Sequence, residues 1–178
     1  LGKKTFINEE GYFHYKKDKI NLVMGRKYNP FGPGRMEGLF ISPIAPSLDQ
    51  ITLEINGLSN FQYRNTIIRL DNRITEWDGK EEIAQRWYYL RSFGYNYKDK
   101  VKINFVDAVI ATGFNRGVEW YYVNPLSSLF MERKHQTQWR EGGDSTAVDL
   151  GDNDNHFIGG NISVNINAWS FYSELLID

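Results

Sequence analysis

Hydrophobic and polar residues alternate along several stretches of this chain. Residues 51–56, 101–105 and 161–168 each follow a period of two. Successive side chains of a β-strand point to opposite faces of the sheet, so this pattern predicts strands with one apolar and one polar face. In 161–168 the two faces carry Ile162, Val164, Ile166 and Ala168 against Asn161, Ser163, Asn165 and Asn167. Such a row of polar side chains suits a water-filled lumen or an exposed surface.

Turn signals separate further strand-like segments. We predict strands at 11–16, 19–27, 61–70, 86–98, 118–123 and 169–177. The expected turns lie at Asn56-Gly57, Asp71-Asn72 and Asp78-Gly79, and a tight hairpin is expected across 98–100. About ten short strands at this spacing predict an all-β fold with an antiparallel sheet that forms a barrel, part of a barrel or a sandwich. A short helix is predicted near 126–135, ahead of a polar loop, and one helical turn leading into a strand is considered at 81–86.

Two apolar runs break the alternation, at 87–90 and 108–111. A strand segment without alternation is buried on both faces or contains a bulge. A barrel with plug segments and a soluble sandwich both provide such an environment, so the two runs do not separate these folds.

Residues 25–46 carry the most distinctive motif of the chain. Gly25-Arg26 is followed by Phe31-Gly32-Pro33-Gly34, by an apolar stretch that ends at Ser42, and by Ala45-Pro46. This order resembles the capsule assembly Wzi family of outer-membrane β-barrels, in which a Trp usually stands where this chain has Phe31. Phenylalanine keeps the aromatic bulk but lacks the indole N–H. Weaker similarities follow at 47–54, 105–111, 116–126, with Asn124-Pro125, and 171–178.

The resemblance implies a barrel in the outer membrane of a Gram-negative bacterium. It implies a surface lectin that binds capsular polysaccharide or exopolysaccharide non-covalently, with no enzymatic activity and no cofactor. The expected partners are this polysaccharide and outer-membrane lipid. Related Bacteroidetes proteins linked to gliding share the pattern, so a structural role in a secretion or gliding assembly with protein partners stays open. A soluble carbohydrate-binding β-sandwich or a glycoside hydrolase is the other alternative.

The chain is expected to form one β-barrel domain over 1–178. It starts at Leu1 without Met and stops directly after a strand-like run, so we expect it to be part of a longer barrel protein. The motif residues expected to be structural are Gly25, Arg26, Gly32, Pro33, Gly34, Ser42, Pro46 and Pro125.

Aromatic residues make up 15% of the chain. Aromatic rings stack on sugars, form girdles at membrane interfaces or fill β cores. Several of them lie in or near predicted turns beside Asn and Arg, whose side chains can bond sugar hydroxyls. The candidate polysaccharide-binding residues are Tyr28, Phe31, Arg35, Arg116, Trp120, Tyr121 and Asn124.

The composition of the chain limits which other ligands and reactions are expected. The net charge of −1 argues against nucleic acid as a partner. There are no cysteines, and the three histidines lack zinc-site spacing, so no metal site is expected beyond a weak calcium candidate at Asp152 and Asp154. Four carboxylates lie in strand-like segments: Glu54, Asp107, Glu119 and Glu174. We expect them to line a polar lumen or to pair with arginines (Arg64, Arg69 or Arg91) rather than to form a glycosidase pair.

Overall fold

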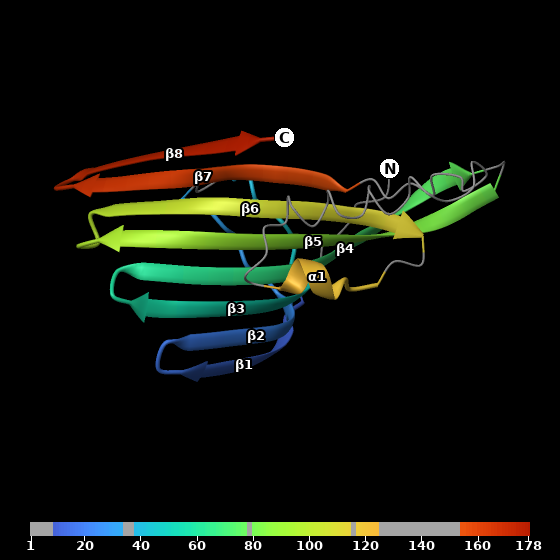
Figure 1. Cartoon of the computed structure of the whole chain (residues 1–178), viewed down its shortest axis with the longest axis horizontal. Coiled ribbons are helices and arrows are strands. Elements are labelled where there is room, and N and C mark those ends of the chain that lie inside the picture. Colours follow the sequence, from blue (N-terminus) through green and yellow to red (C-terminus); the bar gives the residue numbers. More distant parts are fainter. Residues whose placement is uncertain (1–8, 34–37, 78–79, 115–116, 125–153) are drawn as a thin grey trace.

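The computed structural model describes residues 9–33, 38–77, 80–114, 117–124 and 154–178. Within these residues eight strands form one antiparallel sheet, and a single helical turn packs on one of its faces (Figure 1). The elements are β1 (Gly11–Lys17), β2 (Ile20–Lys27), β3 (Leu48–Leu58), β4 (Phe61–Trp77), β5 (Lys80–Tyr97), β6 (Val101–Phe114), α1 (Trp120–Val123), β7 (Asn155–Ile166) and β8 (Trp169–Ile177). The prediction of an all-β antiparallel fold is confirmed.

Each strand pairs with the strand that follows it along the chain, so the order in the sheet is β1 to β8. Every predicted strand except 118–123 overlaps one of the eight. Several are longer than predicted: β4 has 17 residues and β5 has 18. Within the described residues β1 and β8 are the two outer strands.

The connections differ between the two ends of the sheet. At the end drawn on the left of Figure 1, short turns follow β1, β3, β5 and β7. The predicted hairpin at 98–100 is one of them, and Lys98 and Asp99 have the left-handed φ values of 51° and 57°. At the opposite end, the longer segments 28–47 and 115–154 join β2 to β3 and β6 to β7, whereas only residues 78–79 separate β4 from β5.

Two predicted turns are wrong. Asn56-Gly57 stays within β3, where the register with β4 shifts between Asn56 and Leu58, and the chain turns after that shift. Asp71-Asn72 stays within β4, at a register shift between Leu70 and Arg73. Both dipeptides tolerate bends, and here they produce β-bulges because the flanking residues remain paired. Asp78-Gly79 lies outside the described residues.

Cross-strand pairing divides the sheet into two faces of opposite character. What we call the polar face carries Asn56, Gln62, Gly94, Asn104, Asn161 and Glu174, paired in this order across β3 to β8. What we call the apolar face carries Ile20, Ile55, Tyr63, Phe93, Phe105, Gly160 and Leu175, paired across β2 to β8. The alternation predicted at 51–56 and 101–105 is therefore confirmed, and that predicted at 161–168 is confirmed as far as Ile166, because residues 167–168 form the turn before β8.

The middle of β5 and β6 is buried on both faces. On the polar face, Phe31, Phe40 and Ile41 from the segment after β2 pack with Ile68, Tyr88, Leu90, Val106 and Ala108. On the apolar face, Tyr122 of α1 packs with Ile67, Tyr89, Val109 and Ala111. Of the two explanations expected for the runs at 87–90 and 108–111, burial on both faces therefore holds.

The strand predicted at 118–123 is wrong, because Trp120–Val123 form α1. This segment pairs with no strand of the described sheet; it buries Tyr122 against Tyr89, with ring centroids 5.0 Å apart. Over so few residues an apolar alternation cannot distinguish a strand from a packed helical turn. The helix predicted at 126–135 lies outside the described residues. The helical turn considered at 81–86 is wrong, because these residues pair with β4 as part of β5.

Gly25 offers a test of the β1–β2 hairpin. Its φ is +123°, and a Cβ there would lie 2.5 Å from the carbonyl oxygen of Gly11. We therefore expect Gly25→Ala to lower the free energy of unfolding by at least about 1 kcal/mol. Urea unfolding followed by tryptophan fluorescence measures this change.

Gly11→Ala is the matched control, since a Cβ at Gly11 meets nothing within 4 Å. Equal unfolding midpoints for the two variants would contradict the strained conformation assigned to Gly25.

Candidate functional site

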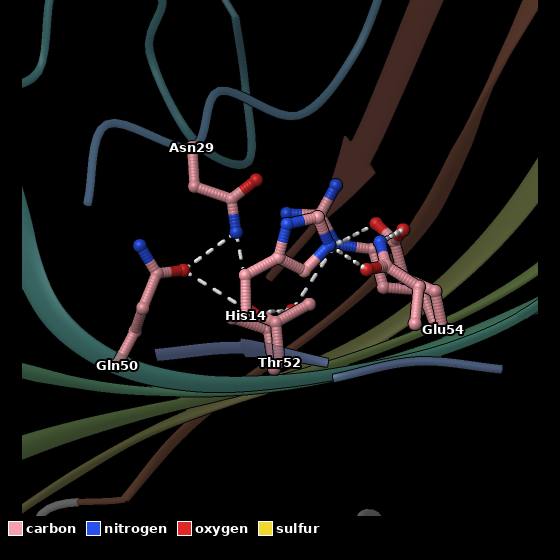
Figure 2. Close-up of polar contacts among 8 residues, drawn as sticks. His14, Asn29, Gln50, Thr52 and Glu54 are labelled. Atoms are coloured by element: carbon pink, nitrogen blue, oxygen red, sulfur yellow. Dashed lines mark hydrogen bonds and ion pairs between the residues drawn. The ribbon is translucent and has the colours of Figure 1, made fainter. Parts of the chain in front are cut away.

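A network of polar side chains occupies the polar face where β1 to β4 meet (Figure 2). Gln50, Thr52 and Glu54 are alternate residues of β3, so all three project from the same face. Asn29, which follows β2, donates from Nδ2 to Gln50 Oε1 at 2.5 Å and to Thr52 Oγ1 at 3.2 Å. Thr52 Oγ1 lies 3.2 Å from Thr66 Oγ1 on β4. These contacts attach the segment after β2 to the sheet.

An ion pair continues this network. Arg64 Nε lies 3.7 Å from Glu54 Oε1, and their side chains are 14% and 26% exposed. Arg64 Nε also donates to Thr66 Oγ1 at 3.1 Å, and the guanidinium lies 5.1 Å from the ring centroid of Phe31. The other carboxylate oxygen of Glu54 accepts a bond from Asn21 Nδ2 at 2.6 Å. Of the arrangements expected for Glu54, pairing with an arginine is therefore present, and the partner is Arg64.

A second polar region covers β6 to β8 on the same face. Asn104 Nδ2 donates to Asn161 Oδ1 at 2.7 Å, and Ser170 Oγ donates to Asn165 Oδ1 at 2.8 Å. A hollow of about 740 Å³ lies here. Its lining includes Gly32, Pro33, Lys102, Asn104, Asn161, Ser163, Asn165, Ser170 and Tyr172. The amide row predicted along 161–165 is one wall of this hollow.

The apolar face exposes large hydrophobic side chains on most strands. They include Phe13, Met24, Ile51, Phe93, Ile103, Phe105, Ile162, Ile166, Phe171, Leu175 and Ile177. A shallow groove of about 470 Å³ crosses β6 to β8 on this face, between Ile103 and Phe105 on one side and Leu175 and Ile177 on the other. It passes over Gly160, where a Cβ would lie 2.4 Å from the carbonyl oxygen of Asn104.

Buried polar groups anchor α1 to the apolar face. Arg91 Nη2 donates to the carbonyl oxygen of Tyr122 at 2.9 Å, and Asn65 Nδ2 donates to that of Val123 at 3.1 Å. The hydroxyl of Tyr122 donates to Asp154 Oδ2 at 2.6 Å. These bonds satisfy backbone carbonyls that a single helical turn leaves open, so the cluster has a structural role.

The predicted binding residues fall into separate groups. Phe31 is buried against Phe40 on the polar face, and Tyr28 donates from its hydroxyl to the carbonyl oxygen of Pro43 at 2.5 Å. Trp120, Tyr121 and Asn124 lie in or next to α1, over the apolar face. Trp120 is 79% exposed, whereas Tyr121 packs edge-on against Tyr122. The described residues therefore form no single site; Arg35 and Arg116 lie outside them.

The motif residues have local structural roles. Gly32 has a φ of +121°, and a Cβ there would lie 2.2 Å from Glu174 Oε1. Arg26 pairs with Asp49 on the neighbouring strand at 3.0 Å. Ser42 Oγ accepts the N–H of Ile44 at 3.2 Å.

The remaining motif residues are three prolines and one glycine. Pro33 is half-buried and Pro46 is exposed. Gly34 and Pro125 lie outside the described residues.

The four carboxylates do not converge. Glu54 and Glu174 are on the polar face, whereas Asp107 is buried on the apolar face, 2.6 Å from His156 Nε2, and Glu119 precedes α1. Glu174 Oε2 accepts the N–H of Leu39 at 2.7 Å. Among the described residues no group of three or more acidic or histidine side chains is arranged to hold a metal ion. Asp154 is bonded to Tyr122, and Asp152 lies outside the described part.

The sequence did not single out Asn29, Gln50, Thr52 or Thr66 as members of one network. The available signal was the alternation along 50–54, but the contacts depend on the β2–β3 and β3–β4 registers and on where the segment after β2 folds back. No family model, curated protein or solved structure matches the chain. In the part of the chain that the structure describes, no helix has the length and apolar character needed to cross a membrane.

Two arginine–carboxylate pairs allow a comparison of buried and exposed charge. Arg64→Ala leaves Glu54 without its ion pair and removes the contact with Phe31. We expect it to lower the free energy of unfolding by about 2 kcal/mol, because a carboxylate loses its partner in a largely buried site. The urea unfolding midpoint reports the loss.

Arg26→Ala is the control, because Arg26 and Asp49 are both 52% exposed. They lie at the ends of β2 and β3 beside the connection 28–47, where the remaining carboxylate is open to solvent. The midpoint of this variant should stay close to that of the unaltered chain. A similar loss in both variants would show that the Glu54–Arg64 pair contributes no more to stability than an exposed ion pair does.

Proposed function

We propose that this chain forms part of the wall of an outer-membrane β-barrel and holds polysaccharide at the cell surface without covalent chemistry. In this arrangement the apolar face meets lipid and the polar face meets the aqueous lumen. The resemblance of residues 25–46 to the Wzi family supports the same role.

The observation that carries the proposal is the division between the two faces. The row from Ile20 to Leu175 runs across seven strands without a charged residue, and large apolar side chains on this face are exposed. Contact with water is unfavourable for apolar surface by about 25 cal/mol per Å². Extended exposed apolar patches on proteins mark contacts with a partner or a membrane. A lipid bilayer covers such a face on all strands at once.

Strand length and connections also support a barrel wall. A strand needs about 9–11 residues to cross the hydrocarbon core at the usual tilt, and each strand from β3 to β8 has at least 9. Outer-membrane barrels have short turns on one side of the membrane and longer loops on the other. The short turns at 98–100 and 167–168, against the long connections 28–47 and 115–154, follow this rule. The exception is the two-residue connection between β4 and β5, which are the two longest strands.

The soluble-sandwich alternative expects Ile162, Val164 and Ile166 to face a protein core. Ile162 and Ile166 are exposed instead, and the strands within the described residues form one sheet. This observation favours the lipid-facing arrangement.

Polysaccharide binding is supported by the chemistry of the polar face and of the exposed aromatic residues. Amides and hydroxyls on β6 to β8 can bond sugar hydroxyls, and Tyr172 beside them offers an exposed ring for stacking. Many weak contacts along one polymer give strong overall attachment.

Adjacent residues of β7 test the membrane orientation. We expect Ile162→Lys to reduce insertion into lipid vesicles, because a lysine facing the bilayer midplane costs about 2–4 kcal/mol. Ser163→Lys, one residue further on the polar face, should insert normally. The insertion yield is read from the difference in gel mobility between unheated and boiled samples. Equal yields for both variants would contradict the orientation.

A pull-down tests whether the protein binds polysaccharide. Protein recovered from outer membranes in detergent should retain the capsular polysaccharide or exopolysaccharide of its own cells. An unrelated outer-membrane barrel prepared in the same way is the control. Retention by both proteins, or by neither, would contradict the polysaccharide role and leave the structural role in a surface assembly.

A further inference from the structure

We infer that the hollow over β6 to β8 is a binding site for an acidic saccharide, one whose sugars carry carboxylate or sulfate groups. This inference rests on the proposed function and assigns a specific site to it. The hollow is distinct from the residues around α1 and from the network around Thr52.

The walls of the hollow carry many groups that can form hydrogen bonds. Asn104, Asn161, Ser163, Asn165 and Ser170 present amides and hydroxyls from three adjacent strands. These groups both donate and accept, as the hydroxyls of a sugar do. A concave site with several convergent polar groups is the usual form of a small-ligand site.

Asn161 provides an independent indication of a ligand. Its side chain is on the polar face and the residue is only 6% exposed. Its Oδ1 accepts the bond from Asn104, but its Nδ2 has no hydrogen-bond partner among the described residues. An unpaired buried donor costs free energy, and on the paired residue of β8 the Oε1 of Glu174 is a buried acceptor without a partner among the described residues. A sugar hydroxyl, which both donates and accepts, would satisfy the two groups together.

Charge defines the class of saccharide. Lys102 lines the hollow, paired with Ser163 across β6 and β7, and no carboxylate is among the described lining residues. The acidic residue next along this face of β8 is Glu174, whose Oε2 is bonded to the N–H of Leu39. Lys102 is the charged residue among the described lining residues, and its ammonium group favours a sugar acid over a neutral sugar at its end of the hollow. The carboxylate of Glu174 lies two positions along the strands, beside Asn161 and Gly32.

Tyr172 supplies the apolar contact. It lines the hollow from β8 and its ring is exposed. An aromatic ring packs against the C–H face of a pyranose while its hydroxyl remains available for hydrogen bonding. The row of amides, the ammonium group of Lys102 and the ring of Tyr172 therefore line one hollow, and together they suit a sugar that carries a negative charge.

The test measures binding of hexagalacturonate and of neutral maltohexaose to the full chain in detergent by isothermal titration calorimetry. We expect hexagalacturonate to bind more tightly. Lys102→Glu should weaken its binding at least about tenfold, because reversing one nearby charge is worth more than 1.4 kcal/mol. Tyr172→Ala should weaken binding of both saccharides.

Lys16→Glu on β1 is the matched control. It makes the same charge change on an exposed lysine of the polar face, remote from the hollow. It should leave the affinity for hexagalacturonate within about twofold of the unaltered chain, since screening weakens charges at such separations. Gel mobility before and after boiling verifies that each variant is folded.

Each other outcome overturns the inference. Equal weakening by Lys102→Glu and Lys16→Glu, or no weakening by either, places the site elsewhere. Equal affinity for hexagalacturonate and maltohexaose would show that the hollow does not prefer an acidic saccharide. If neither saccharide binds while the pull-down retains polysaccharide, the hollow is not the site and the proposed function stands. If the pull-down fails as well, the proposed function is also lost.

Discussion

The structure depends on one constraint: each strand pairs with the next along the chain in an antiparallel ladder, and the side-chain period of two is kept in register across that ladder. A shift of one residue in any pair would move its apolar set to the other face. The registers instead keep Ile55, Phe93, Phe105 and Leu175 on one face and Asn56, Asn104 and Asn161 on the other. The two-sided sheet, its exposed apolar face and its polar hollow all follow.

The same constraint explains the elements that depart from the alternation. At the centre of β5 and β6 both faces are covered, by Phe31 and Phe40 on one side and by α1 on the other, so apolar residues can occupy consecutive positions. Where α1 sits on the apolar face, the sheet carries Arg91 and Asn65 to bond the carbonyls of the helical turn. Arg91 and Asn65 thus occur on the apolar face where the chain itself covers it, whereas Arg26 and Asp49, which are exposed on the same face, lie at the ends of β2 and β3.

Much of the fold could be predicted from the sequence, because alternation is local. The strands at 51–56, 101–105 and 161–166, the hairpin at 98–100 and the covered runs were all predictable. Glycine and asparagine marked bends at Asn56-Gly57 and Asp71-Asn72, but only pairing with the neighbouring strand decides between a turn and a bulge. The helical turn at Tyr122 was missed because its packing against Tyr89 depends on tertiary structure. For the same reason the network around Thr52 and the joint hollow of Lys102, Asn161 and Tyr172 needed the registers.

The central claim is that one face of the sheet meets lipid, and β7 tests it most directly. The chain has no cysteine, so a single cysteine can be placed at each position from 161 to 166 and labelled with a nitroxide in lipid vesicles. The account predicts that labels at 162, 164 and 166 are relaxed mainly by oxygen dissolved in the bilayer. Labels at 161, 163 and 165 should be relaxed mainly by a water-soluble nickel complex. Uniform access of the nickel complex to all six positions would contradict it.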